Sequence, residues 1–307
     1  MNANPPPASD PAPDDILEVA DAASHTTARA ALWWTATPDL DDRKTGAIGA
    51  FEATGADAAI RLLGVAEGRL RQAGVRLAVG PMDGSTWRRY RWVVESDGRG
   101  PFFLEPWNPP EYPLWWKAAG FTRLAGYSSS VVDPRCPPGA PAAVRRRFEQ
   151  SGFKIRHLDA ARFEDELRVI HALSVRSFIG NFLYTPLDAG AFVSDYAKVA
   201  PALDPEFVLF VERGGEPCAF LFGIPDLAAR QRGESPALIA KTIAVLPEHR
   251  RHGIGTILLD ELQAAALRKG YRELIHALQH ETNQSLAITA RLDHRVFRRY
   301  ELLAKKL

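Results

Sequence analysis

One segment of the sequence has the residue types of an anion-binding loop. Residues 245–256 read VLPEHRRHGIGT and run from the end of an apolar strand into the first turn of an amphipathic helix. The first amides of a helix have no partner within it and lie at the positive end of its dipole, so they bind anions. Gly253 and Gly255 let a phosphate approach the backbone, and Arg250 and Arg251 add charge-assisted donors. The segment therefore predicts a phosphate site.

The residues around the glycines distinguish between kinds of phosphate loop. A mononucleotide P-loop needs a Lys and then Ser or Thr after its second glycine, whereas Thr256 and Ile257 follow Gly255. A dinucleotide-binding loop needs a third small residue where Leu258 stands, and an acidic residue at the end of the next strand. Both alternatives lack required residues. What remains is the pattern R-x-x-G-x-G after a strand.

This pattern resembles the coenzyme A pyrophosphate loop of the GCN5-related N-acetyltransferases (the GNAT family), Q/R-x-x-G-x-G/A. The resemblance covers about residues 152–307. It implies that the strand before the loop offers backbone groups to the pantetheine arm, and that an Asn after the next strand lies near the cofactor. The cofactor-binding residues that it implies are Ile243, Ala244, Val245, Arg250, Arg251, His252, Gly253, Ile254, Gly255, Thr256, Asn283 and Ser285.

One residue departs from the family pattern. Many members have a Tyr seven residues after the Asn, where it protonates the leaving thiolate, and this sequence has Ala290 there. The Gly that often ends the same helix is replaced by His294, and Tyr300 lies too late to take the role by motif alone. The resemblance thus implies acetyl-CoA as the acyl donor and leaves the general acid open.

Two histidines on the strand RELIHALQH are candidates for proton transfer. His276 and His280 alternate with Leu274 and Leu278, which predicts that both histidines share one strand face. At the end of the strand, His280 could take a proton from the acceptor amine, because an imidazole titrates near neutrality. The alternative is a partly buried structural histidine.

Three further residues are candidates for the acceptor site. Lys241 is a charge inside the apolar strand ALIAKTIAV, so it either binds an acidic substrate group or reaches the edge of the sheet. Phe182 and Tyr184 lie in the helix–loop region that the resemblance assigns to the acceptor, although core packing also explains the phenylalanine. Arg298 and Arg299 are expected at a charged strand edge.

Helices and strands alternate along the chain, which predicts an α/β fold with a mixed (α+β) sheet. The resemblance implies a GNAT fold in the carboxy-terminal half, packed with a smaller GNAT-like amino-terminal lobe. All seven tryptophans lie at or before Trp116, which indicates two different cores. We expect a disordered tail at residues 1–20, a degenerate lobe at 21–133, a Pro-rich linker at 134–150 and the acetyltransferase domain at 151–307.

The amino-terminal half is similar, more faintly, to that of two-lobed bacterial GNAT proteins, through GAIGAFEA and VGPMDGSTW. It has no R-x-x-G-x-G, so we interpret it as a degenerate lobe that shapes the substrate site. The last stretch, VFRRYELLAKKL, is expected to be a strand with frayed final residues.

Composition limits the other classes of function. The chain has 38 Lys and Arg against 37 Asp and Glu, so it lacks the broad positive field that draws a protein onto nucleic acid or an anionic membrane. Cys136 and Cys218 match no metal or redox spacing, so we expect no metal and a reducing cytoplasm. The first residues resemble no signal peptide, and no apolar run is long enough to span a bilayer.

The sequence thus predicts an acyl-CoA-dependent N-acyltransferase that moves an acetyl group to a primary amine by direct attack, in a monomer or homodimer. The acceptor is a small-molecule amine or a protein amino terminus. The alternative is a non-catalytic acyl-CoA-binding sensor or interaction module, which Ala290 favours. An aminoacyl- or fatty-acyltransferase on the same scaffold is a third possibility.

Overall fold

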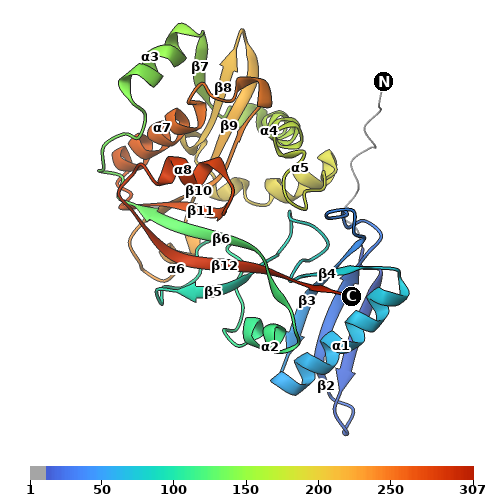
Figure 1. The fold of residues 1–307 in the computed structure, drawn as a ribbon. Coiled ribbons are helices and arrows are strands. Elements are labelled where there is room, and N and C mark those ends of the chain that lie inside the picture. The colour runs from blue at the N-terminus through green and yellow to red at the C-terminus, as the bar shows by residue number, and fades with distance from the viewer. Residues whose placement is uncertain (1–11) are drawn as a thin grey trace, which may run out of the picture.

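Twelve strands form one continuous sheet in the computed structural model, which describes residues 12–307 (Figure 1). The strand order is β1-β2-β3-β4-β12-β6-β11-β10-β9-β8-β7, and β5 pairs with β12 beside this path. The strands β3 and β4 are parallel, as are β10 and β11, and the other pairs are antiparallel. Within this range no helix is long and apolar enough to cross a membrane.

The smaller, amino-terminal lobe is built around helix α1, which packs on β2 and β3. Ala59 and Leu62 on the inner face of the helix are fully buried. Phe51, Trp92 and Trp116 complete this core with edge-to-face ring contacts. The elements are β1 (Asp15–Ala20), β2 (Thr26–Trp33), β3 (Thr45–Ala53), α1 (Ala56–Gln72), β4 (Leu77–Gly80), β5 (Trp92–Ser96), α2 (Tyr112–Ala118) and β6 (Thr122–Val132).

The carboxy-terminal lobe has a separate core, with α4 and α7 on opposite faces of its strands (Figure 1). Leu167 of α4 and Leu258 of α7 are fully buried in it. The elements are α3 (Ala142–Gln150), β7 (Phe153–His157), α4 (Phe163–Phe178), α5 (Ala189–Ala197), β8 (Val208–Arg213), β9 (Glu216–Pro225), α6 (Leu227–Gln231), β10 (Ala237–Val245), α7 (Ile254–Arg268), β11 (Glu273–His280), α8 (Gln284–Thr289) and β12 (His294–Lys306), with 3-10 turns at Ala160–Arg162, Ala200–Ala202, Pro205–Phe207 and Pro247–His249.

The two lobes exchange strands. The strand β6, which ends the amino-terminal half, lies between β11 and β12 of the other half. In turn β12 extends into the amino-terminal lobe, where it pairs with β5 and β4. The expected fraying of the last strand is therefore wrong, because its final residues pair with β4 up to Lys306. Backbone hydrogen bonds across these strands fix one lobe relative to the other.

The structure corrects the expected disordered tail. Residues 1–11 lie outside the described range, but Asp15–Ala20 form β1, which pairs with β2 along its length. Asp14 adds a local anchor, since its carboxylate accepts hydrogen bonds from the backbone amides of Trp34 and Thr35. The sequence interpretation missed this short strand with alternating exposure, because the Pro-rich residues before it indicated a disordered segment.

The expected linker contains a helix. Pro141 precedes α3, where a fixed φ is tolerated, so the helix begins directly after the Pro-rich run. Buried Asp260 of α7 holds this segment, because its carboxylate accepts from the amides of Gly139 (2.8 Å) and Ala140 (3.1 Å) and from Arg145 (2.6 Å). Burial raises the pKa of Asp260. A division of the chain at 134–150 remains a prediction, in a segment that is packed on α7.

Candidate active site

Two parallel strands of the carboxy-terminal lobe separate near its centre, which leaves a gap in their backbone pairing. Pairing between β10 and β11 ends at Ala240 and His276, while β10 continues to pair with β9 up to Val245. A one-residue bulge at Lys241 marks the point of separation. Beyond it, Ile243 and its neighbours have one edge on β9 and the other edge turned toward the gap. This is the strand edge that was predicted to face a pantetheine arm.

The gap leads to a row of unpaired amides. After the turn Pro247–His249, residues Arg251 and Gly253 adopt left-handed φ angles of 73° and 75°, and Gly253 caps α7. The amide of Thr256 donates to the Gly253 carbonyl (3.1 Å). The five amides of residues 251–255 form no hydrogen bond within the described range. We call these five amides the cradle; they suit an anion such as a pyrophosphate.

The side chains of this loop do not converge on the cradle. The Arg250 guanidinium donates to the backbone carbonyl of Ser177 at the end of α4 (2.9 Å). Arg251 is exposed, and the ring of His252 packs edge-on against Phe153, with 5.3 Å between centroids. Backbone amides rather than arginine side chains are therefore the donors that an anion would meet at this loop.

The two glycines of the motif are explained by close neighbours. A Cβ at Gly253 would lie 2.2 Å from Cγ1 of Val144 in α3, and its positive φ also favours glycine. A Cβ at Gly255 would lie 3.3 Å from Cδ1 of Ile288 in α8 and 3.9 Å from Cγ2 of Ile243 in β10. Gly255 thus keeps space free between α8 and the open edge of β10.

The predicted residues Asn283 and Ser285 lie at the start of α8. The Asn283 side chain caps the helix, since its Oδ1 accepts from the Ser285 amide (3.1 Å), and the Ser285 carbonyl accepts from the Thr289 hydroxyl. Ala290, which follows the helix, is exposed. The capping role of Asn283 orients α8 and with it Ile288, which borders the gap.

Comparisons with known proteins identify a family for the segment that contains these elements. A model of the acetyltransferase (GNAT) family matches residues 170–291, which include β10, the cradle, α7, β11 and α8. A segment of the carboxy-terminal lobe thus matches the GNAT family. A search of curated proteins finds no match.

Solved structures show that the GNAT likeness extends over both lobes. A glucosamine N-acetyltransferase region in a fungal multi-domain β-N-acetylglucosaminidase aligns with 94% of this chain (14% identity, TM-score 0.57), and this chain spans 32% of that protein. A GNAT protein from Sphaerobacter thermophilus aligns over 95% of this chain and 80% of its own length, with 14% identity and a TM-score of 0.54. A tandem GNAT protein from the clavulanic acid biosynthesis pathway aligns over 96% of this chain and 84% of its own length, with 15% identity and a TM-score of 0.51. These likenesses show the fold, with two GNAT-like lobes.

The expectation that His276 and His280 share a strand face is wrong. A bulge in β11 inserts one residue between His276, which pairs with Ser130, and Gln279, which pairs with Ser128. His276 and Gln279 therefore point to the same side, where both side chains contact the Thr289 hydroxyl at 2.7 and 3.0 Å. A bulge reverses the alternation that the sequence pattern assumes.

His276 gives the GNAT lobe a pH-dependent stability. Burial, with a smaller contribution from His294, lowers its pKa from 6.5 to about 4. Between these values the unfolded chain binds a proton that the folded protein does not. The free energy of unfolding therefore falls as the pH drops from 6.5 toward 4, by up to about 3 kcal/mol.

We expect urea denaturation to show that the wild type loses more stability than His276→Gln between about pH 7 and pH 4.5. The variant has no imidazole to protonate, so the difference between the two proteins isolates this group from other acid-sensitive residues. Parallel losses in both proteins would contradict the assignment.

His280 lies on the opposite side, at the gap. Its ring packs against Tyr127 (4.9 Å between centroids) and Phe182 (5.5 Å). Its Nδ1 accepts from the Thr282 amide (3.1 Å), so the neutral ring carries its proton on Nε2. Nε2 is buried and has no hydrogen-bond partner in the described part of the chain. This tautomer makes Nε2 a donor, which argues against His280 as the proton acceptor.

A loop of the amino-terminal lobe covers the predicted acceptor residues. The Trp87 indole donates to the Thr185 carbonyl (2.8 Å), and its ring lies 5.8 Å from that of Tyr184. Arg88 forms an ion pair with Asp195 of α5 (2.8 Å). Burial raises the pKa of Tyr184. The amino-terminal lobe thus packs against the residues that were predicted for the acceptor site.

Sequence reasoning missed Arg91, the last residue of this loop. Its guanidinium lies over the rings of Tyr90 (3.7 Å to the centroid) and Tyr127 (4.1 Å), and Nη1 donates to the Leu278 carbonyl (3.3 Å). Burial lowers the pKa of half-buried Lys241 to about 8, and the charge of Arg91 adds to this effect. No motif marks Arg91, because its neighbours come from distant parts of the chain.

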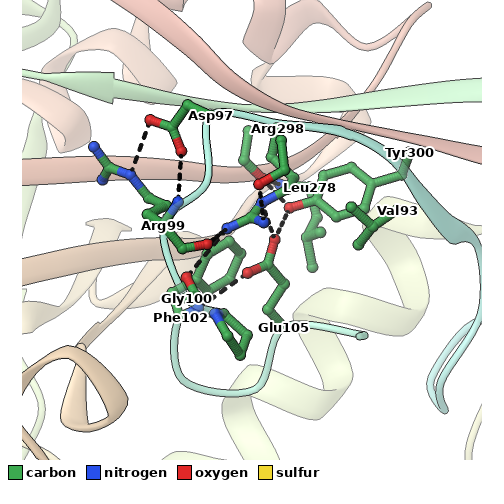
Figure 2. Close-up of polar contacts among 12 residues, drawn as sticks. Val93, Asp97, Arg99, Gly100, Phe102, Glu105, Leu278, Arg298 and Tyr300 are labelled. Atoms are coloured by element: carbon green, nitrogen blue, oxygen red, sulfur yellow. Dashed lines mark hydrogen bonds and ion pairs between the residues drawn. The ribbon is translucent and has the colours of Figure 1, made fainter. Parts of the chain in front are cut away.

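A buried ionic network joins β12 to the loop after β5 (Figure 2). Arg298 Nε lies 3.2 Å from Glu105 Oε1, and neither side chain is exposed. The same guanidinium donates to Ser96 Oγ and to the carbonyls of Arg99 and Gly100. Arg298 was expected at a charged strand edge and is instead buried, because the loop after β5 folds over β12.

This network reaches the bulge of β11. Glu105 accepts from the Tyr300 hydroxyl, which lies 3.0 Å from Ser129 Oγ, and Ser129 Oγ accepts from the Leu278 amide (3.0 Å). Leu278 has a left-handed φ of 56°. Its amide and its carbonyl are both held by residues of the amino-terminal half, so both lobes position the point at which β11 leaves β10.

Proposed function

We propose that this chain is an acyl-CoA-dependent N-acyltransferase that transfers an acetyl group from acetyl-CoA to a primary amine. The observation that carries the proposal is the cradle of five unpaired amides at residues 251–255, placed where β10 separates from β11. An isolated helix start offers an anion site, but not the unpaired edge of a strand that leads to it.

The described residues fit coenzyme A. The cradle amides would hold the pyrophosphate, since they are free donors at the positive end of α7. The open edge of Ile243, Ala244 and Val245 would pair with the amide groups of the pantetheine arm. Gly255 leaves room for that arm beside Ile288. Among residues 12–307, no cluster of His, Cys, Asp or Glu could hold a metal ion.

Bound acetyl-CoA supplies an activated thioester next to the acceptor site. The amine nitrogen donates its lone pair to the new N–C bond, and the C–S bonding pair leaves with sulfur. The proton that nitrogen loses balances the one that sulfur gains. Because Ala290 has no acid and His280 Nε2 is a donor in the neutral ring, water completes both proton transfers in this proposal. The residues contribute mainly by binding and orientation.

The alternative is a sensor that binds acyl-CoA without turnover, which Ala290 favours. A thiol-release assay with acetyl-CoA and a panel of primary amines, amino acids and amino-terminal peptides separates the two. We expect release of free coenzyme A that depends on an added amine, with the acetylated amine detected by mass spectrometry. Acetyl-CoA binding without release for any acceptor would support the sensor.

A further inference from the structure

Nitrogen donors without acceptors gather where the amino-terminal lobe meets the gap. Arg91 is only 6% exposed, yet the one hydrogen bond that its side chain forms within the described range goes from Nη1 to the Leu278 carbonyl. Nε of Arg91 is buried without a partner, as is Nε2 of His280. Nη2 of Arg91 and Nζ of Lys241 also form no hydrogen bond or ion pair with any described residue.

The carboxylates on neighbouring segments are already engaged. Asp83 accepts from the Ala50 amide (2.6 Å) and from Arg89 (3.3 Å). Glu281 accepts from the Gly126 amide (2.9 Å) and pairs with Arg123. Neither is therefore free to balance the charges of Arg91 and Lys241.

Two neighbouring cations in a partly buried site need a counter-charge. Lys241 directly follows Ala240, the last residue of β10 that pairs with β11, and Arg91 donates to Leu278, two residues beyond His276, so both cations lie where the two strands separate. Removing such charges from water without an anion is unfavourable, and a bound anion would offset the unfavourable term. The anion of the cofactor is assigned to the cradle, which follows the carboxyl end of β10, so the charges of Arg91 and Lys241 remain available to the acceptor.

We propose that Arg91 and Lys241 bind a carboxylate of the acceptor, which is therefore an amine that also carries a carboxylate, as an amino acid does. This rests on the proposed acyl transfer. The planar guanidinium of Arg91 matches a carboxylate, Lys241 adds a second charge, and His280 Nε2 adds a neutral donor.

The same cations assist the chemistry. A positive field disfavours the ammonium form of the acceptor, so the amine gives its proton to water more readily and reaches the neutral form that attacks. The site would then need no dedicated base, in agreement with the donor tautomer of His280.

The test measures binding and requires no turnover. N-acetylglycine, N-acetyl-L-alanine and N-acetyl-L-phenylalanine, each against its carboxamide, are titrated into the full chain in the presence of coenzyme A. We expect the wild type to bind at least one acid about 10- to 100-fold more tightly than its amide. Arg91→Met and Lys241→Met should each abolish the preference. Arg123→Met is the matched control, since it removes a nearby cation that already has an acid partner.

Melting curves establish which variants are folded. Lys241 belongs to the other lobe, so Lys241→Met still tests the proposal if Arg91→Met fails to fold. Equal affinity for acids and amides, no binding of either, or a preference that survives in a folded variant would overturn the carboxylate site. Loss of coenzyme A binding itself would instead contradict the proposed function.

Discussion

Replacing Glu105 with glutamine is expected to lower the free energy of unfolding by about 3–5 kcal/mol. The change removes the only carboxylate that faces Arg298 within 4 Å among residues 12–307, while an oxygen remains to accept from Tyr300. Both side chains of the pair are 0% exposed, so the guanidinium would stay buried without a counter-charge. Urea denaturation at neutral pH, followed by circular dichroism, measures the loss.

An exposed ion pair between β5 and β12 provides the control. Glu95 of β5 pairs with Arg299 of β12 at 3.1 Å, and more than half of each side chain is exposed, so Glu95→Gln should cost less than about 1 kcal/mol. The double variant Glu105→Leu with Arg298→Met removes both charges and should recover most of the lost stability. Equal losses for Glu105→Gln and Glu95→Gln would show that the buried pair does not hold the lobes together.

Replacing Gly255 with aspartate is expected to weaken acetyl-CoA binding by about 100-fold or more. The new carboxylate would lie in the first turn of α7 beside the cradle amides, where it would occupy the anion site and repel a pyrophosphate. An acidic residue at a helix N-terminus is favourable for the helix, so the fold should persist. Calorimetric titration and a melting curve for each protein measure the two effects.

Two control substitutions separate the effect of the added charge from the effect of the added side-chain volume. Gly64 of α1 is exposed and has no atom within 4 Å of a would-be Cβ, so Gly64→Asp adds the same charge far from the cradle and should leave affinity unchanged. Gly255→Ala adds only a methyl group 3.3 Å from Ile288 Cδ1, which needs a small shift, and should weaken binding far less than aspartate does. Unchanged affinity in Gly255→Asp would place the pyrophosphate elsewhere.

The cradle could be predicted from the sequence because all of its parts are consecutive. Residues 245–256 contain the strand end, both glycines and the first turn of α7, so spacing alone determines their geometry. The family match at residues 170–291 includes this segment. The conformation of the loop follows from local backbone rules, which a sequence displays directly.

The acceptor side could not be predicted in this way. Arg91 and Leu278 are 187 positions apart, and Glu105 lies about as far from Arg298, so no spacing rule connects them. The bulges at Lys241 and Leu278 are set by pairing with other strands, and each reverses the alternation beyond it. The exchange of β6 and β12 is likewise a property of the whole sheet.

Hydrogen–deuterium exchange of the wild type, with and without acetyl-CoA, tests the central claim most directly. The amides of residues 251–255 have no partner within the described chain, so they should exchange rapidly in the free protein and become protected on binding. The account predicts that acetyl-CoA slows exchange in peptides covering 241–255 and leaves the amino-terminal helix α1 unchanged. No change in those peptides at saturating acetyl-CoA, or protection confined to other regions, would contradict it.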